Sequence, residues 1–161
     1  MTPYSESERE LFRQIILDHY KNPRNKGLSD DPAYQTIHLK NPSCGDDLTV
    51  QIRIEGDRIL DIRHLGSGCA ICCSSASVMS ELLRCRTLDE AKACIKAFKL
   101  MVSAEPFDEN CLEEAVAFEG VAELPPRIKC ATLAWLACEE AIEQRQDSSS
   151  GSAGEADSAK A

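Results

Sequence analysis

Three cysteine-containing segments, widely separated along the chain, constrain its fold most strongly, because they must meet in space if they hold one metal ion. The segments are Asn41-Pro42-Ser43-Cys44-Gly45-Asp46, Gly66-Ser67-Gly68-Cys69-Ala70 and Pro125-Pro126-Arg127-Ile128-Lys129-Cys130. A closed site of the zinc type takes about four ligands, and three thiolates with one carboxylate supply them without a histidine. The sequence therefore predicts a metal site that consists of Cys44, Asp46, Cys69 and Cys130.

Each of these residues also has a simpler structural interpretation. Asp46 is a residue that commonly forms a turn with a neighbouring glycine such as Gly45. Cys130 lies on the apolar stripe of the last predicted helix and could be its first core residue. Against this, Cys69 and Cys130 both open helical patterns, and the free amides at a helix start favour a thiolate. Cys44 lies on a turn-rich loop rather than on an apolar stripe.

The first half of the chain alternates apolar and polar residues, which is typical of strands with one buried face. The alternation covers residues 34–40, 50–54 and 59–65, and Glu55-Gly56-Asp57 predicts a hairpin turn between the last two. We expect a three-stranded antiparallel sheet. The loops around Cys44 and Cys69 then lie at the same end of it, because one precedes the outgoing strand of the hairpin and the other follows the returning strand.

Helical spacing of apolar residues predicts the other elements. Helices are expected over 5–21, with Ser5 or Ser7 as N-cap, and over 88–102, with Thr87 as N-cap. Further helices follow Cys69 and begin near Cys130, whereas residues 104–123 are acidic and less periodic, with one short helix over 113–116. The result is an α+β fold in which the sheet packs against about five or six helices.

Length and composition indicate one domain, since 161 residues with 43% hydrophobic side chains can supply one sizeable core. We place this domain at 1–145. Residues 146–161 are rich in Ser, Ala, Gly and Asp, lack the apolar residues of a core, and are expected to form a disordered tail.

The balance of charge bears on partners and location. Eighteen Lys and Arg against 27 Asp and Glu give a formal net charge of -9, which argues against nucleic acid and anionic membranes as partners. The first residues lack the features of a signal peptide, and no apolar run approaches the roughly 20 residues that span a bilayer. We therefore expect a cytoplasmic protein. In a reducing compartment its nine cysteines indicate metal binding or thiol chemistry rather than disulfides.

The remaining cysteines and the three histidines lack the spacing of metal ligands. Cys72 and Cys73 follow Cys69 closely, and their role stays open between packing and thiol chemistry. The cysteines interpreted as packing residues are Cys85, Cys94, Cys111 and Cys138. The histidines are His19, His38 and His64, and His19 is expected to pack or to form hydrogen bonds.

The three cysteine segments, together with Leu11-Phe12-Arg13-Gln14-Ile15-Ile16-Leu17-Asp18-His19-Tyr20-Lys21-Asn22-Pro23-Arg24-Asn25-Lys26-Gly27, resemble the SufU/IscU/NifU family of iron-sulfur cluster assembly proteins. The resemblance runs from about Leu11 to Glu143 and implies a SufE/IscU-like fold. Within the family the chain is most similar to the SufU branch. Scaffolds of the IscU kind carry a histidine directly before the last ligand cysteine, where this chain has Lys129, and a long segment precedes Leu124-Pro125-Pro126 as in SufU. The family pattern shows no cysteines at positions 72 and 73.

The resemblance implies a zinc-bearing sulfur carrier rather than an enzyme that acts on a small molecule. Such a sulfurtransferase accepts persulfide sulfur from a cysteine desulfurase of the SufS kind and passes it to a downstream cluster scaffold. Cys44 would accept the sulfur while Asp46, Cys69 and Cys130 keep hold of the zinc ion. Arg127 would belong to the surface that engages the desulfurase, and a cation at that position would also favour a thiolate nearby.

Two other functions stay open at the level of sequence. One is a scaffold of the IscU kind that binds iron or assembles a [2Fe-2S] cluster on Cys44, Cys69 and Cys130, because thiolates ligate such clusters as readily as zinc. The other is a structural zinc module whose metal only stabilises the fold. Asp46 argues against the second, since structural zinc sites favour cysteine and histidine ligands.

Overall fold

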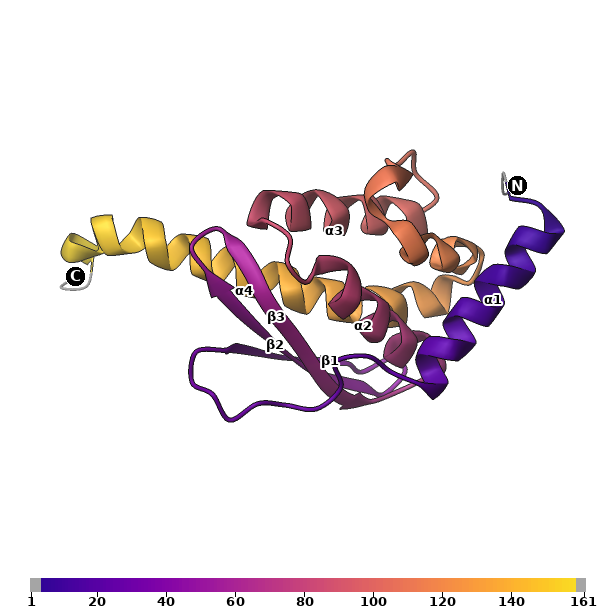
Figure 1. The fold of residues 1–161 in the computed structure, drawn as a ribbon, viewed down its shortest axis with the longest axis horizontal. Coiled ribbons are helices and arrows are strands. Elements are labelled where there is room, and N and C mark those ends of the chain that lie inside the picture. Colours follow the sequence, from indigo (N-terminus) through magenta and orange to yellow (C-terminus); the bar gives the residue numbers. More distant parts are fainter. Residues whose placement is uncertain (1–3, 159–161) are drawn as a thin grey trace.

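Helices cover one side of a three-stranded sheet in the computed structural model, which describes residues 4–158 (Figure 1). The sheet consists of β1 (Gln35–Asn41), β2 (Asp46–Glu55) and β3 (Arg58–Ser67), antiparallel in the order β1-β2-β3. The helices are α1 (Glu6–Lys21), α2 (Ala70–Leu83), α3 (Leu88–Val102) and α4 (Pro125–Ser158), with the 3-10 helices η1 (Glu109–Cys111) and η2 (Glu113–Glu123) between α3 and α4. The predicted α+β class and the predicted sheet are confirmed.

Strand register brings two of the predicted metal loops together. Asn41 pairs with Asp46 across the β1–β2 turn, and Asp47 pairs with Ser67 at the end of β3. Cys44 therefore lies in a tight turn at the same end of the sheet as the segment that leads to Cys69. Gly45 has a φ of 76°, a left-handed conformation that glycine adopts without a steric penalty.

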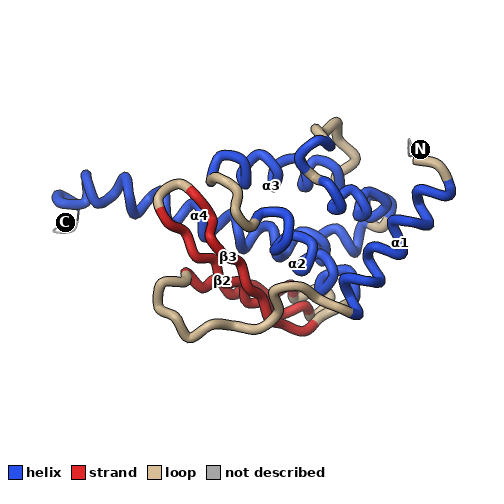
Figure 2. The backbone as a smooth tube through the Cα atoms, viewed as in Figure 1, coloured by secondary structure: helices blue, strands red, loops and turns tan. Residues whose placement is uncertain are grey.

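The helical layer supplies the core against which the sheet packs. Figure 2 shows the strands, in red, on one side of the molecule and most of the helices on the other. Helix α2 packs against β3, and α4 packs against β1 and β2. Trp135 of α4 stacks on Phe98 of α3 with 4.0 Å between ring centroids, and its indole N–H donates to Ser75 Oγ of α2 at 2.8 Å. One buried side chain thus joins three helices.

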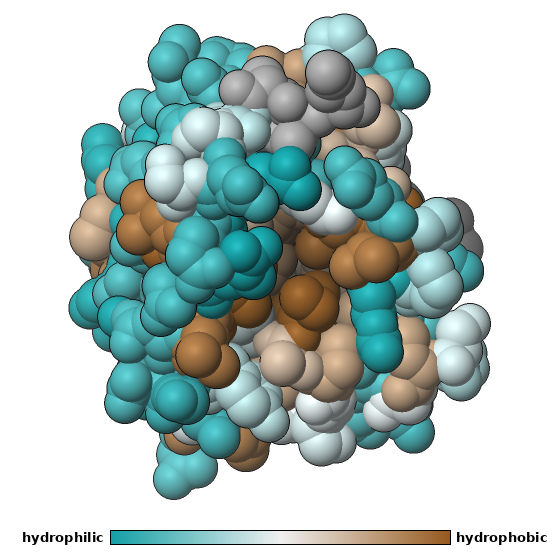
Figure 3. Space-filling model, turned by 90° about the vertical axis from the view of Figure 1, so that its right-hand side faces the viewer, coloured by the Kyte–Doolittle hydropathy of each residue, from teal (hydrophilic) through white to brown (hydrophobic). Residues whose placement is uncertain are grey.

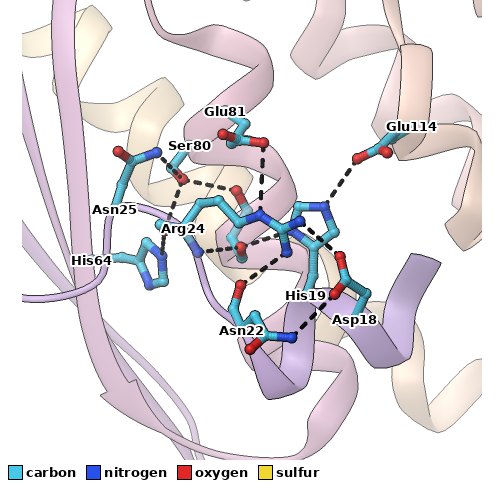
Figure 4. Close-up of polar contacts among 10 residues, drawn as sticks. Asp18, His19, Asn22, Arg24, Asn25, His64, Ser80, Glu81 and Glu114 are labelled. Carbon is cyan, nitrogen blue, oxygen red and sulfur yellow. Dashed lines mark hydrogen bonds and ion pairs between the residues drawn. The ribbon is translucent and has the colours of Figure 1, made fainter. Parts of the chain in front are cut away.

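The end of α1 is joined to α2 and η2 by a buried histidine (Figure 4). His19 is buried, its Nδ1 lies 2.8 Å from Ser77 Oγ, and its Nε2 lies 3.0 Å from Glu114 Oε1. Because the carboxylate only accepts, the ring proton belongs on Nε2. The loop after α1 then reaches β3, where His64 Nε2–H donates to the carbonyl of Arg24 at 2.7 Å. His19 thus packs in the interior and forms hydrogen bonds, as expected.

The beginnings of the helices follow the sequence closely, with one exception. Ser5 caps α1 and Thr87 caps α3, each in a reciprocal capping box with a glutamate. The exception is α4, which the sequence predicted to begin near Cys130. The helix begins at Pro125, so Cys130 lies in its second turn. Proline fits the first position of a helix because its missing N–H would have no partner there.

The segment between α3 and α4 is more regular than its sequence suggests. A short helix was expected over 113–116, and η2 extends over Glu113–Glu123. Its buried side chains are those of Ala115, Ala117, Phe118 and Val121. This spacing differs from the period of an α-helix, and so the pattern did not indicate a long helix.

The predicted division into a domain over 1–145 and a disordered tail over 146–161 stays a prediction. The helical backbone of α4 continues to Ser158, and Figure 1 shows its end extending beyond the sheet. Residues 159–161 of the predicted tail lie outside the described residues. Within residues 4–158, none of the helices has the length and apolar character that a membrane span requires.

Candidate metal centre

Three potential ligand atoms converge where the β1–β2 turn meets α4. The ligand atoms of Cys44, Asp46 and Cys130 all lie within 4.8 Å of one another, and the Sγ atoms of the two cysteines are 2.9 Å apart. Cys44 comes from the turn, Asp46 is the first residue of β2, and Cys130 projects from the second turn of α4. The fold thus brings together three of the predicted ligands. Two come from the β1–β2 hairpin and one from α4, and Cys44 and Cys130 are 86 positions apart in the sequence.

The carboxylate of Asp46 shows that the cluster suits a cation. Asp46 is 1% exposed, and its Oδ1 accepts a hydrogen bond from the backbone N–H of Cys69 at 3.1 Å. Its Oδ2 is buried and has no hydrogen-bond partner among the described residues. A buried carboxylate oxygen without a donor is costly, and a bound cation removes that cost. Thiolates with one carboxylate form a donor set that zinc accepts.

Cys69 is placed beside the cluster rather than within it. It is the N-cap residue of α2 and is half-buried, and its sulfur is not among the three ligand atoms grouped within 4.8 Å. Its thiol nevertheless lies close enough to Cys130 to affect it. Burial, and then contacts with Asp46, Cys44 and Cys69, raise the pKa of the Cys130 thiol. The role of Cys69 as the fourth ligand stays a prediction.

Arg127 lies at the solvent edge of this cluster. It is exposed, and the pKa of its guanidinium is raised chiefly by a hydrogen bond to the Cys130 side chain and then by the charge of Cys69. The sequence suggested that a cation here would favour a thiolate. At Cys130 burial outweighs that effect, because the pKa of this thiol is raised. A hollow of about 570 Å³ beside Arg127 is lined by Ser43, Cys44, Pro125, Pro126, Arg127 and Lys129.

Asn41 is a site residue that the sequence analysis did not identify. It is 4% exposed, and its side-chain N–H donates to Cys44 Sγ at 2.9 Å, with Cys130 Sγ at 3.9 Å. The backbone carbonyl of Asn41 accepts a hydrogen bond from the backbone N–H of Gly45 at 2.8 Å, which closes the turn. Donors of this kind orient metal ligands and stabilise thiolates. The burial of the Asn41 side-chain amide cannot be inferred from sequence. The one feature of the sequence that could have indicated a role in the site is its position three residues before Cys44.

The other cysteines divide by burial. Cys72, Cys94 and Cys138 are buried, as packing residues are, and Cys73 and Cys111 are half-buried. Cys85 is exposed, so its interpretation as a packing residue is wrong. It follows the end of α2 with a φ of 72°, and its backbone N–H bonds to Ile59. The backbone of Cys85 is therefore held by its place in the turn after α2 and by this hydrogen bond, and the thiol itself is not buried.

An apolar groove lies near the same loops. It encloses about 310 Å³ between α1 and η2, and its apolar lining includes Phe12, Ile16, Ile71, Val121 and Leu124. Figure 3 shows one end of the molecule, with apolar side chains, in brown, gathered around a hollow within a largely hydrophilic face. Leu124 directly precedes α4 and is 51% exposed. Apolar surface of this kind is typical of protein-binding faces.

The contact between Gly68 and Asp46 leads to a testable prediction. A Cβ at position 68 would lie 2.4 Å from Asp46 Oδ1, so Gly68→Ala is expected to displace the carboxylate. Zinc affinity should fall by about tenfold or more, the usual effect of disturbing the support of a ligand. Competition with a chromophoric chelator measures it. Gly120→Ala is the matched control, because a Cβ there meets nothing within 4 Å. Unchanged affinity of Gly68→Ala would argue that Asp46 is not a ligand.

Comparison with known proteins identifies several relatives. The family described as NifU-like N terminal domain matches residues 11–149. The zinc-dependent sulfurtransferase SufU of Bacillus subtilis is 37% identical over 137 residues, which cover 84% of this chain and 92% of that protein. The iron-sulfur cluster assembly scaffold protein IscU of Streptococcus pyogenes is 37% identical over 136 residues, which cover 83% of this chain and 84% of its own.

Solved structures agree with these relatives. A protein from Fervidobacterium islandicum, described as a scaffold for iron-sulfur cluster assembly in the SUF system, has 34% identity and a TM-score of 0.73, covering 86% of this chain and 96% of its own. The N-terminal part of a NifU-like protein from Brucella abortus shares the fold with a TM-score of 0.78 at 23% identity, covering 87% and 97%. The resemblance inferred from the four sequence motifs is thus confirmed, and this chain belongs to the NifU-like N-terminal domain family.

Proposed function

We propose that this protein is a zinc-bearing sulfur carrier of iron-sulfur cluster assembly, which accepts persulfide sulfur from a cysteine desulfurase of the SufS kind. One observation carries the proposal: Cys44 belongs to the cluster of potential ligands and also lines the open hollow beside Arg127. A thiol in that position can serve a metal site and still meet a partner. Cys130, by contrast, is buried with 0% of its surface exposed. The similarity to SufU of Bacillus subtilis supports the same conclusion.

The residues that would hold zinc are Cys44, Asp46, Cys69 and Cys130. A bound zinc ion would keep the thiolates deprotonated near neutral pH and neutralise the buried carboxylate of Asp46. Asn41 would donate to Cys44 throughout, since its amide already lies 2.9 Å from that sulfur. Asp46 is held from the other side by the N–H of Cys69.

Sulfur transfer requires a thiol that can move and attack. In the proposed step the Cys44 thiolate attacks the outer sulfur of a persulfide on the desulfurase. A new S–S bond forms on Cys44 while the S–S bond of the donor breaks, and the donor cysteine leaves as a thiolate. Cys44 lies on a short turn, so its movement leaves helices intact, whereas Cys69 caps α2 and Cys130 lies within α4. The carried sulfur then passes to a downstream scaffold protein.

The surface around Cys44 suits a protein partner. Arg127 and Lys129 give its rim positive charge, which guides an acidic surface or an anionic persulfide toward the thiol. The apolar groove that includes Leu124 and Ile71 lies next to the segments that carry Cys130 and Cys69. A charged rim beside an apolar surface is the usual composition of a transient protein interface.

Arg127→Ala is expected to slow sulfur transfer by about tenfold, because a charge at the rim of an interface guides the approach of the partner and so affects chiefly the rate of association. Its zinc content should match that of the unmodified protein, because the guanidinium is not a ligand. The measurement is the initial rate of desulfurase stimulation at low salt, with zinc determined in parallel. Arg53→Ala removes an equal charge from a partly exposed position on the sheet and should have no effect. Unchanged stimulation by Arg127→Ala would reduce this residue to an ordinary surface charge.

Metal analysis of protein purified without oxygen tests the proposal against the scaffold function, which the IscU relatives keep open. About one zinc per chain and no visible absorption favour the carrier, because zinc has a filled d shell. A brown protein that contains iron and sulfide favours the scaffold. A purely structural zinc module would bind the same metal but would take up no persulfide sulfur.

A further inference from the structure

Two cysteines outside the metal cluster lie side by side. Cys94 projects from α3 and is buried with 0% of its surface exposed, and Cys111 ends η1 and is half-buried. The Cys94 thiol donates a hydrogen bond to the carbonyl of Cys111 at 3.3 Å. The pKa of the Cys94 thiol is raised to about 12, first by its burial and then by the neighbouring Cys111 side chain.

The surrounding structure holds this pair in place. Helix α3 packs against both η1 and η2. Leu112, the next residue after Cys111, is 0% exposed and anchors the segment in the core. Asp108 caps η1 through the backbone N–H of Asn110 at 3.0 Å, and its carbonyl lies 3.8 Å from Cys111 Sγ. The backbone around both cysteines is therefore held in place without support from the metal cluster.

We propose that Cys94 and Cys111 form a reversible disulfide, a thiol modification site that responds to two-electron oxidants such as hydrogen peroxide. The proposal rests on the contact of the Cys94 thiol with the backbone of Cys111, a residue that is itself partly exposed to solvent. It goes beyond the sulfur carrier function and does not depend on it, because neither cysteine belongs to the metal cluster.

The chemistry follows the exposure of the two thiols. Cys111 reacts first, because it is half-exposed. Its thiol loses a proton, the thiolate attacks one peroxide oxygen to give a sulfenic acid, and the hydroxide that leaves takes up that proton as the first water. The sulfur of Cys94 then attacks the sulfur of Cys111, an S–S bond forms, and hydroxide leaves and takes up the thiol proton as a second water. Two thiols are thus oxidised by two electrons while one peroxide becomes two waters. The second step should be slow, since the raised pKa of Cys94 keeps its thiolate scarce.

The bond would tie the connection after α3 back to that helix. The two cysteines are 17 positions apart, so the disulfide closes a loop that is open in the reduced chain. Closing such a loop removes conformational freedom from the unfolded chain and raises stability when the native geometry already fits. The oxidised protein should therefore melt at a higher temperature than the reduced one.

Mass spectrometry on the full-length, zinc-loaded protein tests this. Dilute protein is treated with hydrogen peroxide, unfolded in the presence of N-ethylmaleimide, and digested without reduction. The expected product joins the peptides of Cys94 and Cys111, weighs two hydrogens less than their sum, and disappears on treatment with dithiothreitol. The melting temperature of the oxidised protein should rise and return to its original value after reduction.

Three variants complete the test. Cys111→Ser and Cys94→Ala should each lose both the joined peptide and the rise in melting temperature, and Cys111→Ser suffices alone because its half-exposed site tolerates the change. Cys138→Ser, at another buried cysteine, should keep both. The exposed Cys85 reports the oxidant dose. If Cys85 is oxidised while Cys94 is still recovered as the alkylated thiol, or if Cys111 pairs with a different cysteine, the proposal is wrong.

Discussion

Cys44→Ala is expected to abolish the transfer of persulfide sulfur to this protein. Of the two cysteines in the cluster of potential ligands, Cys44 is half-buried and lines the open hollow, whereas Cys130 is buried. Cys72 cannot readily replace it, because burial raises the pKa of that thiol and the side chain is 1% exposed. Without Cys44 the rate of transfer should fall to the background of the assay.

The experiment incubates the protein with a cysteine desulfurase and free cysteine, then alkylates it and measures the peptide masses. The unmodified protein should gain one sulfur on the Cys44 peptide, and Cys44→Ala should lose both this gain and the stimulation of the desulfurase. Cys73→Ser is the matched control, since it removes a half-buried thiol near Cys69 and should transfer sulfur normally. Sulfur found on Cys72 or Cys73 of the unmodified protein would contradict the role of Cys44 as acceptor.

Cys130→Ser and Cys69→Ser are expected to lose zinc and thermal stability together. Cys130 is buried against Cys44 and Asp46, so its replacement leaves a buried carboxylate without a compensating cation. Affinity should fall by more than about 100-fold, since residues that only support ligands already change it by 10-fold to 100-fold. Binding displaces a proton from each thiol, so affinity should also weaken as the pH falls. The raised pKa of Cys130 strengthens that competition by protons.

Zinc content after dialysis, competition with a chelator at several pH values, and thermal melts with and without added zinc provide the measurements. Cys138→Ser is the control for damage to the core, because this thiol is buried in α4 outside the cluster. It should lower the melting temperature while zinc binding persists. Full zinc retention in both Cys69→Ser and Cys130→Ser would overturn the ligand assignment.

Local patterns were enough to locate most elements of the fold. The hairpin of β2 and β3 follows from alternation around Glu55-Gly56-Asp57, and α3 begins where Thr87 can cap it. These features depend on residues close in sequence, whose preferences are largely intrinsic. The start of α4 was misplaced because a proline pair reads equally as a stiff linker and as a first helical turn. In the structure the proline pair forms the first turn of α4, and this helix packs against β1 and β2.

By itself the sequence determined which residues could bind a metal and that the loops of Cys44 and Cys69 share one end of the sheet. Ligand chemistry is a property of residue types, and strand order follows from a hairpin. Only the tertiary structure decided that Cys130 reaches Cys44 from the second turn of α4, that Asn41 donates to their thiols, and that the Cys94 thiol contacts the backbone of Cys111. These contacts join residues whose distance from one another along the chain does not indicate whether they meet. They depend on how whole helices pack, which is set by the complete core and not by any local pattern.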